Sequence, residues 1–157
     1  MVGKKAPNFK LKDSRGKLVS LAELVREKNL ILVFYPKDFT PGCIRQLSNI
    51  RDAYSRVRRA GAEVVGINAD DVNSHRRFID AYGLPFELLQ DTGLKTARAY
   101  DCVVEGSNNI NRTVVGIAKG GEIVFYQRGM PSISDILKPI RRAARKKASD
   151  ADKNLSP

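Results

Sequence analysis

The feature that most constrains the fold is an alternation between short apolar runs and longer stretches with helical spacing. The first run, residues 29–35 (NLILVFY), is apolar throughout, as is typical of a central strand buried on both faces. Apolar residues three or four apart then begin at Ile44, and Gly61 is placed to end that helix. Strand-like runs recur at 62–67 and 86–89, with another helical stretch between them. Strands and helices that alternate in this way indicate an α/β sheet with parallel pairing.

Hairpin turns add antiparallel strands at both ends of this alternation. The turn at 13–16 (DSRG) predicts an N-terminal β-hairpin, and the Lys-Gly-Gly at 119–121 predicts a second one. After a last amphipathic helix, residues 148–157 are predicted to form a disordered C-terminal tail. We therefore expect an α/β fold with a mixed central sheet and helices on both faces, formed by one domain over residues 1–147.

The composition predicts a cytoplasmic protein. The longest apolar run is far shorter than the roughly 20 residues that cross a bilayer, so no membrane association is expected. Residues 1–13 lack the apolar core of a signal peptide. Two cysteines are too few for a disulfide scaffold, so each must be judged by its own surroundings.

The chain is strongly basic, with 28 basic and 17 acidic side chains and a formal net charge of +11. Much of the charge lies at 51–59 and 141–147. No zinc-finger spacing or Gly-rich RNA motif accompanies it, so we expect a solvated basic face and no specific nucleic-acid partner. A nucleic-acid-associated protein is the alternative that this charge keeps open, and it would bind with a steep salt dependence.

The chemistry is concentrated at residues 34–43 (FYPKDFTPGC), where the first apolar strand gives way to a helix. Thr40 is a suitable N-cap and Pro41 a suitable first helical residue, which places Cys43 in the first turn. Backbone N–H groups there have no intrahelical partner, and the helix dipole favours an anion. Cys43 is therefore predicted to be a reactive thiolate rather than an inert packing residue.

This segment resembles the active-site string of the peroxiredoxins, because Pro36, Thr40 and Cys43 reproduce the pattern Pro-x3-Thr-x2-Cys. The full string resembles the bacterioferritin comigratory protein (peroxiredoxin Q) branch of the AhpC/TSA family, and the likeness extends over roughly residues 3–140. The resemblance implies a thioredoxin-like fold. It implies an antioxidant peroxidase that reduces hydrogen peroxide and organic hydroperoxides without a cofactor or metal. It also implies thioredoxin, glutaredoxin or a small thiol as the reductant, and a monomer.

The resemblance assigns roles to individual residues. Cys43 matches the peroxidatic cysteine, which attacks the O–O bond and becomes a sulfenic acid. Thr40 matches the threonine that bonds the thiolate and the peroxide, and Pro36 the proline that shields the site from water. Arg112 matches the arginine that stabilises the thiolate and the breaking O–O bond. Gln46 stands where relatives often have Glu; it would orient Arg112 by hydrogen bonding, or else be an ordinary helix-surface residue.

The sequence departs from this branch at the resolving thiol. Many members carry a resolving cysteine five residues after the peroxidatic one, and here that position is Ser48. The other thiol in the sequence is Cys102. Three routes stay open: reduction by an external thiol, a Cys43–Cys102 bridge within the chain, or a bridge between subunits.

Three further interpretations apply to this sequence. A thioredoxin-fold redox sensor or thiol relay is the alternative function, and it would react with an oxidant without efficient turnover. His75, the one histidine of the sequence, is predicted to lie on a helix surface, and no Cys–His pair has metal-ligand spacing. Asp70 and Asp71 are predicted to be turn residues.

Overall fold

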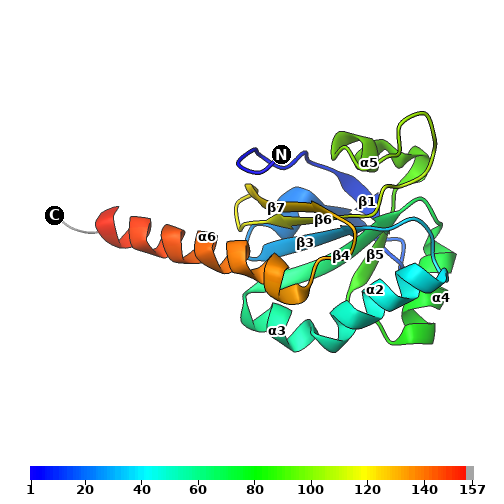
Figure 1. Ribbon diagram of the computed structural model, residues 1–157, viewed down its shortest axis with the longest axis horizontal. Helices are drawn as coiled ribbons and strands as arrows, with labels where there is room; N and C mark the ends of the chain where they lie inside the picture. The colour runs from blue at the N-terminus through cyan, green and yellow to red at the C-terminus, as the bar shows by residue number, and fades with distance from the viewer. Residues whose placement is uncertain (155–157) are drawn as a thin grey trace.

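The computed structural model describes residues 1–154, which form one seven-stranded sheet with helices on both faces (Figure 1). The strand order is β2-β1-β5-β4-β3-β6-β7. Its centre consists of β3 (Asn29–Phe34), β4 (Ala62–Asn68), β5 (Glu87–Gln90) and β6 (Thr113–Ile117). Pairing is parallel between β3 and β4 and between β4 and β5, but antiparallel between β3 and β6. The predicted mixed sheet is confirmed.

Both predicted hairpins are present at the edges of the sheet. The N-terminal hairpin consists of β1 (Lys10–Lys12) and β2 (Leu18–Ser20), and it joins the sheet where Lys12 pairs with Gln90 of β5. The second hairpin joins β6 to β7 (Ile123–Arg128), with an irregular register between Gly116 and Ile117.

Alternate residues of β3 face two separate cores, and Leu30 to Phe34 are all fully buried, as is Tyr35, which follows the strand. On one face, Leu30 and Phe34 pack in the same core as residues of α1 (Leu21–Leu24) and α5 (Lys95–Ala99), the latter following the short 3-10 helix η1 (Thr92–Leu94). The opposite face packs against α2 (Pro41–Asp52), α3 (Tyr54–Arg59), α4 (Val72–Tyr82) and α6 (Ile133–Asn154). Burial contributes about 1.5–3 kcal/mol per large apolar side chain, so β3 anchors both layers.

Two helices differ from the sequence prediction. The helix expected to begin at Pro41 and to end at Gly61 is divided into α2 and α3 at Ala53, whose backbone leaves the helical region (φ −102°, ψ 9°). The segment predicted to be disordered from Ala148 instead continues α6 to Asn154, since alanine and lysine are good helix formers. Residues 155–157 of the predicted tail lie outside the described residues.

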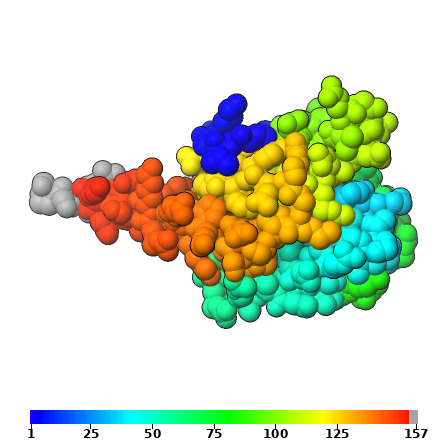
Figure 2. All heavy atoms as spheres, viewed as in Figure 1, coloured from blue at the N-terminus to red at the C-terminus, as the bar shows by residue number. Residues whose placement is uncertain are grey.

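The C-terminal half of α6 projects beyond the sheet (Figures 1 and 2). Its basic side chains are exposed; they are Arg141, Arg142, Arg145, Lys146 and Lys147. Among the described residues, no helix combines the length and apolarity that a membrane crossing requires.

Gly66 provides a test of the packing between β4 and its neighbours. A Cβ at this position would lie 2.6 Å from Leu88 Cδ2 and 2.9 Å from Tyr35 Cε1, both on fully buried side chains. The Tyr35 hydroxyl donates to Asp38 at 2.6 Å, which restrains the ring. We expect Gly66→Ala to lower the free energy of unfolding by about 1–3 kcal/mol through overpacking, measured by urea denaturation. An unchanged unfolding midpoint would contradict this packing.

Candidate active site

The start of α2 places Cys43 in the first helical turn, as predicted, with its side chain fully buried. Pro41 occupies the first helical position, and Thr40 has the extended backbone of an N-cap (φ −83°, ψ 147°). The Thr40 hydroxyl does not cap the helix, however, because it donates to the Lys37 carbonyl at 2.8 Å. The predicted N-cap position is confirmed, but the Thr40 hydroxyl accepts no hydrogen bond from the first-turn N–H groups around Cys43.

Arg112 joins the site from the residue before β6. Its Nη2 donates to Cys43 Sγ at 3.4 Å, and its Nη1 donates to Gln46 Oε1 at 2.5 Å. Gln46 is only 4% exposed, so it is not the ordinary surface residue of the alternative interpretation. The Arg112 carbonyl also accepts a hydrogen bond from the Gly129 N–H at 2.8 Å. A cation held in this way can stabilise a thiolate and negative charge developing beside it.

Two other predicted residues lie outside this contact group. Pro36 lies two residues after the end of β3 and is exposed at the start of the loop formed by residues 36–40. Cys102 is fully buried in the core on the other face of the sheet from Cys43, and its thiol donates to the Tyr100 carbonyl at 3.2 Å. A disulfide between the two cysteines would require one of them to leave its face of the sheet.

The surroundings of Cys102 disfavour its thiolate. Burial raises the pKa of the Cys102 thiol, and hydrogen bonds from Thr113 and Tyr126 oppose this shift only in part. Because the thiolate is the nucleophile in disulfide exchange, Cys102 is a poor attacking group in this conformation.

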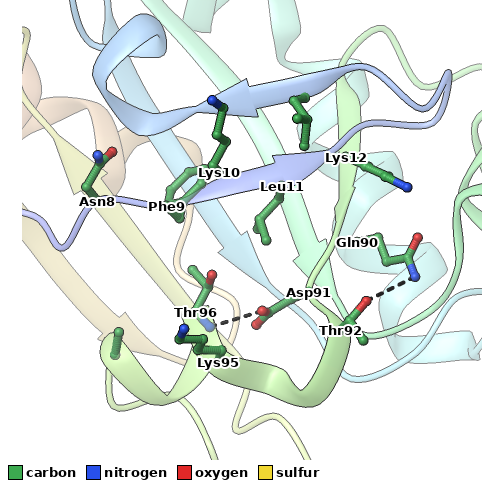
Figure 3. Close-up of a pocket in the computed structure, with 12 residues that line it drawn as sticks. Asn8, Phe9, Lys10, Leu11, Lys12, Gln90, Asp91, Thr92, Lys95 and Thr96 are labelled. Carbon is green, nitrogen blue, oxygen red and sulfur yellow. Dashed lines mark hydrogen bonds between the residues drawn. The ribbon is translucent and has the colours of Figure 1, made fainter.

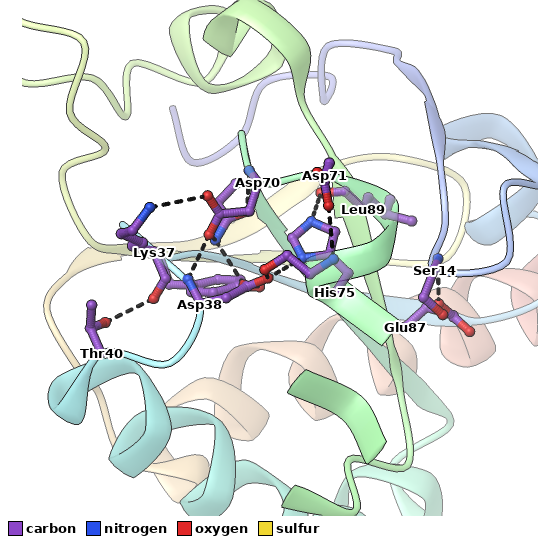
Figure 4. A network of polar contacts seen from close by, with 12 residues as sticks. Ser14, Lys37, Asp38, Thr40, Asp70, Asp71, His75, Glu87 and Leu89 are labelled. Carbon is purple, nitrogen blue, oxygen red and sulfur yellow. Dashed lines mark hydrogen bonds and ion pairs between the residues drawn. The ribbon is translucent and has the colours of Figure 1, made fainter. Parts of the chain in front are cut away.

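The sequence interpretation missed a buried polar cluster behind the loop (Figure 4). Asp38 is 5% exposed, and its Oδ1 accepts hydrogen bonds from the Tyr35 hydroxyl at 2.6 Å and from Asn68 Nδ2 at 3.1 Å. Its Oδ2 accepts from the Ser74 hydroxyl at 2.8 Å and lies 2.7 Å from His75 Nδ1. Four groups from three elements thus converge on one carboxylate.

His75 is fully buried, so its predicted position on a helix surface is wrong. The available signal was the helical spacing to Phe78, three residues further along α4, which is also fully buried and shares the inward face. Asp70 and Asp71 do serve the turn before α4. Asp71 caps the helix by accepting from the Ser74 N–H at 2.8 Å, and Asp70 accepts from the Asp38 N–H at 2.7 Å.

A cleft elsewhere in the molecule does not contain these residues. It measures about 510 Å³ and lies between β1 and the η1–α5 segment, with Phe9, Leu11 and Lys95 among its lining residues (Figure 3). Its buried carboxylate, Asp91, accepts from the Thr96 N–H at 3.0 Å and therefore supports α5. Among the described residues, no group of three or more His, Cys, Asp and Glu side chains is arranged to hold a metal ion.

Comparison with known proteins connects this geometry to one family. The model of the AhpC/TSA family matches residues 2–126. A chloroplastic peroxiredoxin Q of Triticum aestivum is 48% identical over 98 residues, which cover 62% of this chain and 45% of the relative. The corresponding protein of Arabidopsis thaliana is 48% identical over 96 residues, covering 61% and 44%. The match thus spans less than half the length of these curated relatives.

Solved structures share the fold. A peroxiredoxin Q structure from Xanthomonas campestris is 26% identical, with a TM-score of 0.74 over 88% of this chain and 90% of that chain. The crystal structure of peroxidoxin BcpB from Mycobacterium tuberculosis is 24% identical, with a TM-score of 0.83 over 90% and 96% of the two chains. The expected thioredoxin-like fold is confirmed.

The buried Asp38 carboxylate makes the stability depend on acid pH. Burial opposes its ionisation, but the hydrogen bond and charge of His75, with hydrogen bonds from Tyr35 and Ser74, outweigh burial and lower its pKa below the ordinary 3.8. Its stabilising contribution is thus complete above pH 3.8 and lost as the pH falls through the lower folded value. We expect Asp38→Asn to cost about 1–3 kcal/mol at pH 7. The difference from wild type should shrink below pH 3.8, measured by urea denaturation across pH; a constant difference would contradict this account.

Gly42 leaves space for the Arg112 guanidinium. A Cβ on Gly42 would lie 3.2 Å from Arg112 Nη2, so the guanidinium that contacts Cys43 must shift by a few tenths of an ångström. We expect Gly42→Ala to slow the reaction of Cys43 with hydrogen peroxide about tenfold, a loss of about 1.4 kcal/mol of transition-state stabilisation. The free energy of unfolding should not fall, because alanine is the better helix former. Stopped-flow kinetics measures the oxidation rate of Cys43, and urea denaturation measures the free energy of unfolding. An unchanged oxidation rate would contradict the predicted displacement of Arg112.

Proposed function

The chain belongs to the AhpC/TSA family, and on that premise we propose that it is a thiol-dependent peroxidase with Cys43 as its peroxidatic residue. The observation that carries the proposal is the 3.4 Å contact between Cys43 Sγ and Arg112 Nη2 in the first turn of α2. A thiolate beside a fixed cation at a helix N-terminus is an activated nucleophile. Hydrogen peroxide and organic hydroperoxides are the proposed substrates, and the similarity to peroxiredoxin Q proteins supports a peroxide substrate.

The proposed reaction is a displacement at oxygen. The Cys43 thiolate attacks one peroxide oxygen, so that an S–O bond forms as the O–O bond breaks and the sulfur becomes a sulfenic acid. The other oxygen leaves with the bonding electron pair and takes up a proton, giving water or an alcohol. Arg112 stabilises the charge that develops on the oxygens. Thr40 is assigned to hold the peroxide, because its hydroxyl oxygen can accept a hydrogen bond while its proton goes to the Lys37 carbonyl, and Pro36 is assigned to limit water.

We propose that an external thiol reduces the sulfenic acid. Position 48 is a serine, and Cys102 lies across the sheet with a raised pKa, which together support this route over a bridge within the chain. Thioredoxin is the proposed reductant, with glutaredoxin or a small thiol as alternatives. A monomeric state and a cytoplasmic location also belong to the proposal, although the named relatives are chloroplastic.

Two cysteine variants separate the proposed roles. We expect Cys43→Ser to abolish peroxide consumption, because the other thiol, Cys102, is buried with a raised pKa and does not replace it, while Cys102→Ser keeps the rate of the first oxidation within about twofold. Intact mass after one equivalent of peroxide, followed by alkylation, should show oxygen added at Cys43 with Cys102 still alkylated. Consumption at the wild-type rate by the Cys43 variant would overturn the peroxidase proposal. Loss of both alkylation sites in the wild type would overturn only the proposed reduction by an external thiol. A single oxidation of Cys43 without further peroxide consumption would favour a redox relay.

A further inference from the structure

The loop of residues 36–40 is attached to the protein body chiefly through one side chain. Asp38 is the buried residue of this loop, while Pro36, Lys37 and Phe39 are exposed. Its carboxylate accepts hydrogen bonds from residues at the ends of β3 and β4 and from two residues of α4 (Figure 4). Its backbone N–H donates to Asp70, which also pairs with Lys37 at 3.6 Å. The loop therefore depends on a junction of three elements.

His75 completes this junction from the side away from the loop. Its Nδ1 lies 2.7 Å from Asp38 Oδ2, and its Nε2 lies 3.2 Å from the Leu89 carbonyl of β5. Both ring nitrogens face oxygen acceptors, so both contacts are hydrogen bonds when the ring carries both protons. A charged imidazolium would then offset the charge of Asp38 inside the protein. The ring thereby fixes the carboxylate relative to the sheet.

The conformation that this junction holds is unfavourable on its own. Phe39 has φ 64°, in the left-handed region that side chains other than glycine seldom adopt, and such a backbone persists only where surrounding contacts enforce it. Its ring lies 5.0 Å from Phe78 and 6.3 Å from Tyr82 of α4, centroid to centroid. Thr40 follows directly, and its hydroxyl closes the loop onto the Lys37 carbonyl at 2.8 Å. Releasing Asp38 would free this backbone to relax and to turn Thr40 away.

We propose that Asp38 and His75 form a positioning pair, which holds the loop and Thr40 in the orientation that lets Cys43 react with peroxide. Neither side chain needs to touch the substrate, because each acts through the loop. The inference rests on the proposed peroxidase function and adds a requirement for residues of α4, far along the chain from Cys43. It separates positioning of the peroxide, assigned to Thr40, from stabilisation of the thiolate by Arg112.

The test compares two reactions of the same thiol in the full-length protein. Reaction with hydrogen peroxide requires the thiolate and the oriented loop, whereas alkylation by iodoacetamide requires the thiolate and access alone. We expect His75→Leu to lower the second-order rate constant with peroxide about tenfold or more, with alkylation of Cys43 unchanged or faster. His75→Asn keeps a donor near the Nδ1 position and should recover to within about threefold of the wild type. Ser74→Ala removes only one donor to Asp38 and should lower the rate constant with peroxide by a smaller factor. Because it removes a single hydrogen bond, it also provides a variant that folds if His75→Leu does not.

Asp91→Asn is the matched control for loss of stability. Asp91 is also a buried carboxylate, 1% exposed, but it supports α5 across the sheet from Cys43. We expect this variant to unfold at lower urea concentration with an unchanged peroxide rate constant. Equal peroxide rates in the wild type, His75→Leu and Ser74→Ala would overturn the positioning role and leave the peroxidase proposal standing. A parallel fall in peroxide reaction and alkylation would also overturn it, while a wild type inert to peroxide would overturn the proposed function itself.

Discussion

The full burial of β3 determines where every functional side chain is placed. Because its two neighbours are held in fixed register, Phe34 pairs with Thr113 of β6 on one side and with Ile67 of β4 on the other. The residues that adjoin these pairs therefore meet at one edge of the sheet. Arg112 arrives there from β6, Asn68 from β4, and the loop with α2 from β3 itself. Side chains separated by many residues become neighbours through backbone pairing alone.

The neutral side chain of Gln46 can orient Arg112 without cancelling its positive charge. Gln46 accepts a 2.5 Å hydrogen bond from Arg112 and is itself buried in α2. A carboxylate there would hold the guanidinium equally well, but its negative charge would cancel much of the field that Arg112 exerts on the sulfur. An amide oxygen orients the guanidinium and leaves its positive charge directed at Cys43. A neutral residue at this position is thus compatible with an activated thiol.

The sequence predicts those features that depend on local pattern. The apolar run of β3, the Lys-Gly-Gly turn and Pro41 at the start of α2 each follow from residues close together in the chain. The contact of Arg112 with Cys43 was expected only by resemblance, since nothing local distinguishes this arginine from others. The burial of His75 has only the helical spacing to Phe78 as a local signal, because an imidazole becomes a core residue only when a distant group, here the Asp38 carboxylate, forms a hydrogen bond with it.

The two cysteines show how one sheet can both protect and isolate a reactive thiol. Cys43 is fully buried, so an oxidised sulfur can meet an external thiol only after the start of α2 or the loop before it opens. Where it is the loop that opens, the contacts of Asp38 that favour the closed geometry would be broken in the reductive half of the proposed cycle. Tighter attachment of the loop would favour reaction with peroxide and slow reduction, while looser attachment would do the reverse. The buried carboxylate of Asp38 can serve both halves of such a cycle. Water can replace its hydrogen bonds when the loop opens, whereas nothing in water would replace a lost apolar contact.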